Sequence, residues 1–186
     1  MQAGSTTPKV QEVGSIVEDF TLPCANGRPS SLVASLEGKR GAVVMFWSGI
    51  CSHCVRYDGY LNGFAARHPE IPLLTIASRI GEDAAVVQKS VADRNLTFPI
   101  YIDAGAAIAK KWFTQQTPRA FLISPDLKIL YRGAIDNFKF ADDPQYEPYL
   151  EPAIEALLAG KPQPRAETAS FGCAIQSVYY ILPKSL

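Results

Sequence analysis

Short runs of apolar residues alternate along the chain with stretches in which apolar residues recur at helical spacing. The continuous runs predict strands at 20–22, 42–47, 71–77 and 98–102. The helical spacing predicts helices at 52–67, 81–95, 106–113 and 146–158. Residues 120–123 and 129–132 flank a turn-rich stretch and predict an antiparallel hairpin. Together these elements predict an α/β fold, with a central mixed sheet covered by helices on both faces.

The length and composition of the chain fit one compact domain. The chain has 186 residues, of which 47% are hydrophobic and 19% are charged, so it can bury a sizeable core without a second domain. We expect residues 1–13 to form a flexible segment and residues 14–160 to form the domain. Residues 161–186 are then a tail packed on or extending from the domain. Its segment from Pro162 to Leu186, which is Pro-rich at first and apolar from Val178 to Leu182, is a candidate strap.

The charge pattern argues against several classes of partner. The formal net charge is +0, and the basic residues are scattered, which disfavours nucleic acid and anionic membrane surfaces. We expect no membrane span, because no apolar run approaches the ~20 residues that a span needs. The first residues lack the features of a secretory signal. The compartment stays open between the cytoplasm and an exported protein whose signal has been removed.

The segment Cys51-Ser52-His53-Cys54 carries the clearest chemical signal. It follows the strand predicted at 42–47 and begins the helix predicted at 52–67. A thiol at the start of a helix ionises more easily than usual, and its thiolate is the nucleophile of disulfide exchange. A second thiol two residues further along can displace the mixed disulfide that the first one forms. The pair therefore predicts a reversible dithiol redox site that needs no bound cofactor.

A metal site and a non-catalytic role are the alternatives for the same cysteines. A structural zinc or iron–sulfur site needs about four ligands, and one such pair supplies two of them. The others would come from Cys24, Cys173, His53 or His68, none of which forms a second close pair. We therefore expect no metal. A binding module that uses the cysteines without catalysis remains the alternative from a different functional class.

Several motifs resemble the thioredoxin fold. They are Phe46-Trp47 before the cysteine pair, Thr117-Pro118 before a strand, and the hairpin that ends in Tyr131-Arg132-Gly133. Residues 14–22 resemble the N-terminal hairpin of the redoxin branch, which includes alkyl hydroperoxide reductase/thiol-specific antioxidant relatives and membrane-anchored thiol–disulfide reductases. Residues 131–136 and 172–175 also look like a peroxiredoxin-like subgroup of that branch.

The resemblance implies roles for individual residues. Cys51 would be the attacking thiol and Cys54 the resolving thiol, and Pro118 would be a cis-proline facing them. Thr117 would offer its backbone to an extended substrate, and Trp47 matches the aromatic residue before the active-site turn. The implied activity is thiol–disulfide exchange with protein thiols and disulfides, together with an electron-donating or electron-accepting redox partner.

The chain departs from the family pattern at the position of the buried acid. Thioredoxins carry an acidic residue in the strand before the dithiol, and Met45 stands there in this chain. The sequence therefore predicts that this proton-transfer group is absent. Asp58, four residues after Cys54, is the nearest candidate for a proton relay.

His53 lies between the two cysteines and predicts an oxidising potential. A histidine there favours the Cys51 thiolate, which stabilises the reduced form. We expect a potential above that of thioredoxin, and an unchanged potential in His53→Ala would contradict this.

A peroxiredoxin-like peroxidase using Cys51 is the closest alternative among enzymes. Peroxiredoxins place Thr or Ser three residues before the reactive cysteine and Pro seven residues before it. Ser48 meets the first condition and Val44 fails the second, while Arg119 is a candidate for positive charge near Cys51.

Cys24 and Cys173 have no assigned role from the sequence. They pair with each other, or Cys173 exchanges with Cys51 as a third redox thiol, or both are ordinary packed thiols, and all three possibilities stay open.

Overall fold

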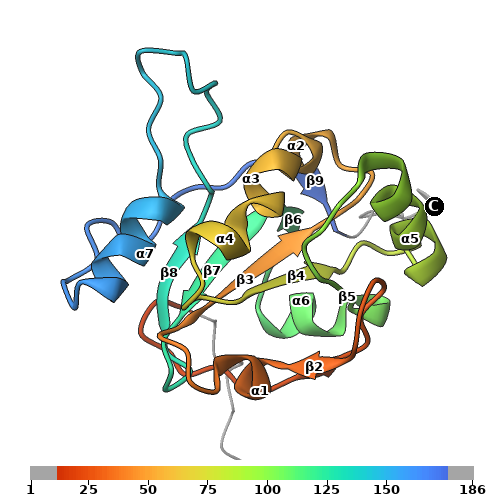
Figure 1. Cartoon of the computed structure of the whole chain (residues 1–186), viewed down its shortest axis with the longest axis horizontal. Helices are drawn as coiled ribbons and strands as arrows, with labels where there is room; N and C mark the ends of the chain where they lie inside the picture. Colours follow the sequence, from red (N-terminus) through yellow and green to blue (C-terminus); the bar gives the residue numbers. More distant parts are fainter. Residues whose placement is uncertain (1–11, 176–186) are drawn as a thin grey trace, which may run out of the picture.

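The computed structural model of the chain describes residues 12–175 (Figure 1). Most of the flexible segment predicted at 1–13 and the last part of the candidate strap, residues 176–186, lie outside these residues.

The fold is built on a five-stranded mixed sheet with the order β5-β4-β3-β7-β8. The strands are β3 (Ala42–Trp47), β4 (Leu73–Ala77), β5 (Ile100–Ile102), β7 (Arg119–Ile123) and β8 (Ile129–Gly133). The pairs β3–β4 and β4–β5 are parallel, whereas β3–β7 and β7–β8 are antiparallel. Every residue of β3 is buried, because this central strand is covered on both faces. The predicted strands, hairpin and mixed α/β class are confirmed.

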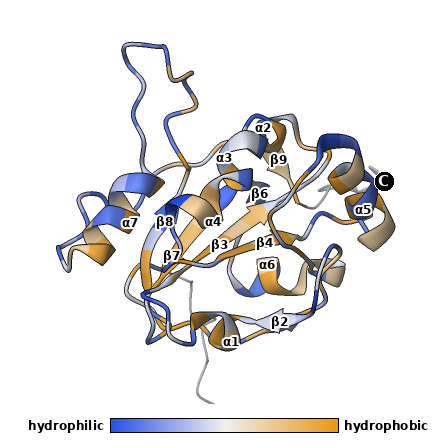
Figure 2. Cartoon of the chain, viewed as in Figure 1, coloured by the Kyte–Doolittle hydropathy of each residue, from blue (hydrophilic) through white to orange (hydrophobic). Residues whose placement is uncertain are grey.

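Helices cover both faces of the sheet, as Figure 1 shows. One face packs against α2 (Ser52–Val55), α3 (Asp58–Asn62), α4 (Phe64–Arg67), α5 (Ala84–Arg94) and α7 (Leu150–Leu158). The opposite face packs against α1 (Leu32–Leu36), the 3-10 helix η1 (Ala104–Ala106), α6 (Ala107–Lys111) and the small hairpin of β1 (Thr21–Leu22) and β2 (Ser30–Ser31). Figure 2 shows the apolar strands lying between these two layers.

The single helix predicted at 52–67 is wrong, because three short helices occupy this range. Gly59 and Gly63 weaken helical continuity, and the backbone of Tyr57 leaves the helical region with φ −99° and ψ 7°. Leu61 and Phe64 are buried as expected, whereas Val55 is 40% exposed.

The other helices lie close to their predicted positions. In α5 the Asp83 carboxylate accepts a hydrogen bond from the Val86 amide, and Asn95 ends the helix in the left-handed conformation with φ 52°. The last helix begins at Leu150 rather than at Tyr146, because residues 136–149 form the loop that projects beside α7 in Figure 1.

The segment after α7 returns along the edge strand β8 to the cysteine pair. Arg132 forms an ion pair with Glu167 at 2.8 Å, and the Thr168 amide donates to the Arg132 carbonyl at 3.1 Å. The segment ends in β9 (Cys173–Ala174), which pairs antiparallel with β6 (Gln116–Thr117). The end of the described chain therefore lies next to the start of α2.

Tyr131 fastens this returning segment to the sheet. Its buried hydroxyl donates to the Ala134 carbonyl at 2.6 Å and lies 2.7 Å from the Thr168 hydroxyl. We expect Tyr131→Phe to lower the free energy of unfolding by about 1–3 kcal/mol, because buried partners lose their hydrogen bonds. The substitution should also accelerate hydrogen exchange at the Thr168 amide.

Tyr60→Phe is the matched control for this prediction. The Tyr60 hydroxyl donates to Glu151 at 2.7 Å, away from the returning segment. Its removal should leave hydrogen exchange at Thr168 unchanged. Equal exchange at Thr168 in Tyr131→Phe and in the wild-type protein would contradict the anchoring role of Tyr131.

Candidate active site

Cys51 stands at the junction of the central strand and α2. It precedes the first residue of α2, and its carbonyl accepts from the Cys54 amide at 2.9 Å. The side chain is completely buried, with 0% exposure. Because α2 has only four residues, the long helix that would favour the thiolate is reduced to a single short turn.

Cys54 is buried one turn further along and carries a free thiol. Burial raises the pKa of this thiol to about 12, and the negative charge of Glu82 adds a smaller increase. Cys54 is therefore protonated at neutral pH in this state of the protein. A protonated thiol is a poor nucleophile, so Cys54 attacks a disulfide slowly in this state.

The loop before β7 faces Cys51 from the other side. The Thr117–Pro118 peptide bond is cis, in agreement with the geometry that the resemblance implies. Thr117 is buried, and its carbonyl oxygen lies 3.5 Å from the Cys51 sulfur. The structure thus brings Cys51, Cys54, Thr117 and Pro118 together from two segments of the chain.

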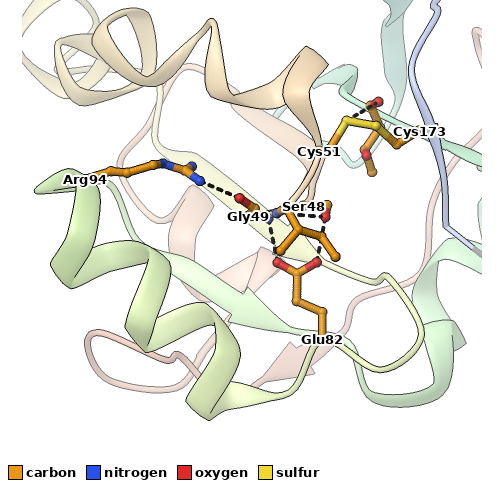
Figure 3. Close-up of a disulfide and its surroundings, with 8 residues drawn as sticks. Ser48, Gly49, Cys51, Glu82, Arg94 and Cys173 are labelled. Atoms are coloured by element: carbon orange, nitrogen blue, oxygen red, sulfur yellow. Dashed lines mark hydrogen bonds between the residues drawn. A yellow bond between two sulfur atoms is a disulfide. The ribbon is translucent and has the colours of Figure 1, made fainter.

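Cys51 forms a disulfide with Cys173, and their Cα atoms are 5.8 Å apart (Figure 3). Cys173 pairs with Thr117 in the register of β6 and β9, so its strand follows the cis-proline loop. Cys24 is a free thiol that hydrogen-bonds with the Asn26 side chain. Of the three possibilities left open by the sequence, the structure thus has Cys173 joined to Cys51 and not to Cys24.

A buried carboxylate supports the turn before Cys51. Glu82 follows β4 and is only 5% exposed. One of its oxygens accepts from the Ser48 hydroxyl at 2.6 Å, and the other accepts from the Gly49 amide at 2.5 Å (Figure 3). A buried acid therefore lies beside the site in the loop after the neighbouring parallel strand β4, whereas the position in β3 that thioredoxins give to an acid holds the buried Met45 as expected.

Arg94 holds the same turn from the side of α5. Its guanidinium donates to the Gly49 carbonyl (Figure 3). It also donates to the two oxygens of the Asp58 carboxylate, at 2.8 and 3.1 Å. The guanidinium also lies over the Trp47 ring, 5.5 Å from its centre. Asp58 thus forms an ion pair with Arg94, and its role as a proton relay stays a prediction. The sequence did not single out Glu82 or Arg94, although the shared edge of adjacent parallel strands was a signal for Glu82.

Two of the predicted site residues, His53 and Trp47, contact aromatic rings. His53 is exposed, and its ring lies edge-on to Phe138 at 6.3 Å between centres. Its effect on the potential stays a prediction. Trp47 is fully buried and packs edge-on against Phe98 at 6.0 Å, so its ring belongs to the core in this state.

Arg119 does not serve the cysteine pair. Its guanidinium lies 5.6 Å from the centre of the Phe121 ring, on the face of the sheet opposite to the cysteines. Burial, followed by the nearby positive charge of Arg132, lowers the pKa of Arg119. The expected positive charge near Cys51 is therefore not supplied by this residue.

Comparison with known proteins places the chain in a family. The Redoxin family model matches residues 2–150, which is most of the chain. The chain belongs to the Redoxin family. The thiol-disulfide oxidoreductase ResA of Bacillus thuringiensis is 30% identical to this redoxin over 126 residues, which cover 63% of this chain and 73% of that protein.

Solved structures show the same fold. A hypothetical protein of Sinorhizobium meliloti superposes with a TM-score of 0.78 at 25% identity, covering 90% of this chain and 96% of that one. A secreted disulfide oxidoreductase of Mycobacterium tuberculosis, described as homologous to E. coli DsbE, superposes with a TM-score of 0.53 at 25% identity, covering 75% and 95%. The predicted thioredoxin-like fold and redoxin relationship are confirmed, and the chain is an oxidoreductase of the thiol–disulfide class.

Residues 12–175 contain neither a cluster of metal ligands nor a membrane-spanning helix. No group of three or more His, Cys, Asp or Glu side chains within this range is arranged to hold a metal ion. Within the same range, no helix has the length and apolar character needed to cross a membrane.

Proposed function

We propose that this redoxin exchanges disulfides with extended segments of protein substrates through Cys51 and Cys54. The observation that carries the proposal is strand β9, a peptide segment whose cysteine is joined to Cys51 while its backbone pairs with the Thr117 strand. An external peptide that docks in the same way would present its sulfur to Cys51. The loop of Thr117 and Pro118 then serves as the docking edge.

The proposed exchange proceeds in two balanced steps. The Cys51 thiolate attacks one sulfur of a substrate disulfide, which forms a mixed disulfide and releases the other substrate sulfur as a thiolate. Cys54 then loses its proton and attacks the Cys51 sulfur, which forms the Cys51–Cys54 disulfide and releases the second substrate thiolate. The two substrate sulfurs are reduced and the two protein sulfurs are oxidised. The reverse sequence oxidises a substrate dithiol.

Peroxide reduction is less favoured by the surroundings of Cys51. The Ser48 hydroxyl, which stands where peroxiredoxins carry a peroxide-binding hydroxyl, donates its hydrogen bond to Glu82. Arg119 lies on the opposite face of the sheet. Neither group is therefore free to polarise a peroxide beside Cys51.

The test uses a peptide dimer whose two chains are joined by one disulfide. The dimer is mixed with the reduced protein, and the released peptide thiols are counted. All variants carry Cys173→Ser, so that only Cys51 and Cys54 can react in the site. We expect two peptide thiols per molecule with Cys173→Ser alone. With Cys54→Ser added, we expect one thiol and a protein mass raised by one peptide, and with Cys51→Ser added we expect none.

The rate of the second step gives a further check. Cys54 acts at an effective concentration in the millimolar range, so its removal should slow release of the bound peptide about 100-fold when an external thiol at ~10 μM replaces it. Release of both peptide thiols by the protein that lacks Cys54, with no external thiol present, would overturn its role as the resolving thiol.

A further inference from the structure

The segment of residues 170–175 fills the groove beside the cis-proline loop. Cys173 pairs with Thr117, and the Ile175 amide donates to the Gln115 carbonyl at 2.9 Å. The Ile80 amide in turn donates to the Ile175 carbonyl at 3.0 Å. The segment is therefore held on both sides, as an added strand would be.

Side chains at the start of this segment add further contacts. The Gln116 side chain donates to the carbonyl of Ser170. Phe171 packs edge-on against Phe138, with 5.6 Å between the ring centres. The segment thus contacts both β6 and the projecting loop after β8.

Gly172 approaches the cis-proline loop more closely than any other residue type could. A Cβ atom built at this position would overlap the carbonyl oxygen of Thr117 and would crowd its carbonyl carbon at 2.6 Å. These atoms belong to the backbone of a buried residue and cannot move aside as a flexible side chain could. The groove therefore requires glycine immediately before the cysteine that reaches Cys51.

The bound segment also closes the site. Cys51 has no exposed surface, whereas Gly172 and Ala174 on either side of Cys173 are exposed. An external disulfide cannot contact the Cys51 sulfur while the segment is in place. The segment and an external substrate must therefore compete for one groove.

We propose that residues 170–175 are a tethered substrate of this redoxin, with Cys173 as a second resolving thiol, and that the groove selects extended peptides with glycine directly before the cysteine. The proposal rests on the proposed function and adds the specificity of the groove. It also implies that oxidation to the Cys51–Cys173 disulfide blocks the access of external substrates to Cys51.

The added step balances as a thiol–disulfide exchange. After Cys51 has formed a mixed disulfide with a substrate, the Cys173 thiolate attacks the Cys51 sulfur and releases the substrate thiolate. The product is the Cys51–Cys173 disulfide. Cys54 can later attack the Cys51 sulfur, which forms the Cys51–Cys54 disulfide and returns Cys173 as a thiolate. No oxidant beyond the substrate disulfide is needed.

Cys54 supports the persistence of this closed form. Because burial raises the pKa of Cys54, its thiol is protonated next to the Cys51–Cys173 disulfide. The closed form therefore rearranges slowly at neutral pH.

The first test changes Gly172 in a protein that carries Cys54→Ser, where Cys173 is the remaining resolving thiol of the site. The reduced protein is treated with 10 μM peptide dimer, and its disulfides are mapped after acid quenching. We expect Cys51–Cys173 to outcompete the peptide by about 100-fold, because a tethered thiol acts at roughly millimolar concentration. Gly172→Ala should remove this advantage and leave the peptide on Cys51.

Ala174→Ser is the matched control, because Ala174 lies on the same strand and is exposed. It should form Cys51–Cys173 as readily as the parent protein. Equal formation of that disulfide in Gly172→Ala and in the parent protein would overturn the proposal.

The second test uses peptides and leaves the groove intact. Disulfide-linked dimers of Ser-Phe-Gly-Cys-Ala-Ile, the sequence of residues 170–175, are compared with dimers in which alanine replaces the glycine. On the Cys173→Ser protein we expect the glycine peptide to react at least ~10-fold faster, and equal rates would overturn the selectivity. If both peptides react and yield the Cys51–Cys54 disulfide at equal rates, the proposed function stands without the glycine requirement. If neither reacts, the proposed function itself fails.

Discussion

Raising the pH from 7 to 9 is expected to accelerate conversion of the Cys51–Cys173 disulfide into the Cys51–Cys54 disulfide by about 100-fold. The attacking group is the Cys54 thiolate, and burial raises the pKa of this thiol to about 12. Below that pKa the thiolate fraction rises about tenfold for each pH unit, and the rate of attack follows it. A thiol with an ordinary pKa of about 8.5 would instead approach a plateau near pH 9.

The conversion is measured on the protein isolated in the Cys51–Cys173 form near pH 6 and then shifted in pH. Samples are quenched with acid, and their disulfides are identified by peptide mapping. Cys54→Ser should retain the Cys51–Cys173 disulfide at every pH, which excludes exchange through Cys24. A rate that is independent of protein concentration identifies the intramolecular step, and equal rates at pH 7 and 9 would contradict the buried, protonated state of Cys54.

The sheet was predictable because its strands carry their own local signal. The run from Ala42 to Trp47 is apolar without interruption, as a central strand covered on both faces must be. The hairpin of β7 and β8 was equally readable from its turn residues. The division into three short helices after Cys51 was not predictable, because Gly59 and Gly63 interrupt the helix while its apolar residues keep helical spacing.

From the residues alone, the site was predictable only where they are neighbours in the sequence, and the family resemblance added Thr117 and Pro118. The spacing of Cys51 and Cys54 indicates a dithiol site directly. Cys173 is 122 residues from Cys51 and reaches it through a segment with no regular pattern. Glu82 is 34 residues from Ser48 and carries no motif. Both contacts depend on the path of the chain around the sheet, which apolar periodicity does not encode.

Glu82 positions the turn before the dithiol through its hydrogen bonds with Ser48 and Gly49. Its two oxygens hold the Ser48 hydroxyl and the Gly49 amide, and Arg94 holds the Gly49 carbonyl from the other side. The amide and the carbonyl of Gly49, in the turn that leads into Cys51, are therefore both hydrogen-bonded to side chains (Figure 3). Glu82 acts through this turn and is a positioning residue, since no contact joins it to the sulfur of Cys51 among the interactions described for residues 12–175.

Replacing Glu82 by alanine should therefore damage both stability and exchange. The Ser48 hydroxyl and the Gly49 amide would lose a charged acceptor in a buried site, which should lower the free energy of unfolding by about 3 kcal/mol. For a domain of this length, the loss corresponds to a fall in Tm of roughly 6–12 °C. Displacement of Cys51 should slow exchange with a peptide disulfide about tenfold or more.

Glu82→Gln distinguishes the effect of the Glu82 hydrogen bonds from the effect of its negative charge. A glutamine oxygen can accept from the Gly49 amide while its NH₂ group donates to Ser48, whose hydroxyl can accept as well as donate. The geometry of the turn should survive, so the exchange rate near neutral pH should stay much closer to that of the wild-type protein than in Glu82→Ala. Because the negative charge of Glu82 adds to the raised pKa of Cys54, its removal should also lower that pKa and make Cys54 react faster at a given pH. Loss of exchange in Glu82→Gln as severe as in Glu82→Ala would contradict positioning through hydrogen bonds and would assign the effect to the charge.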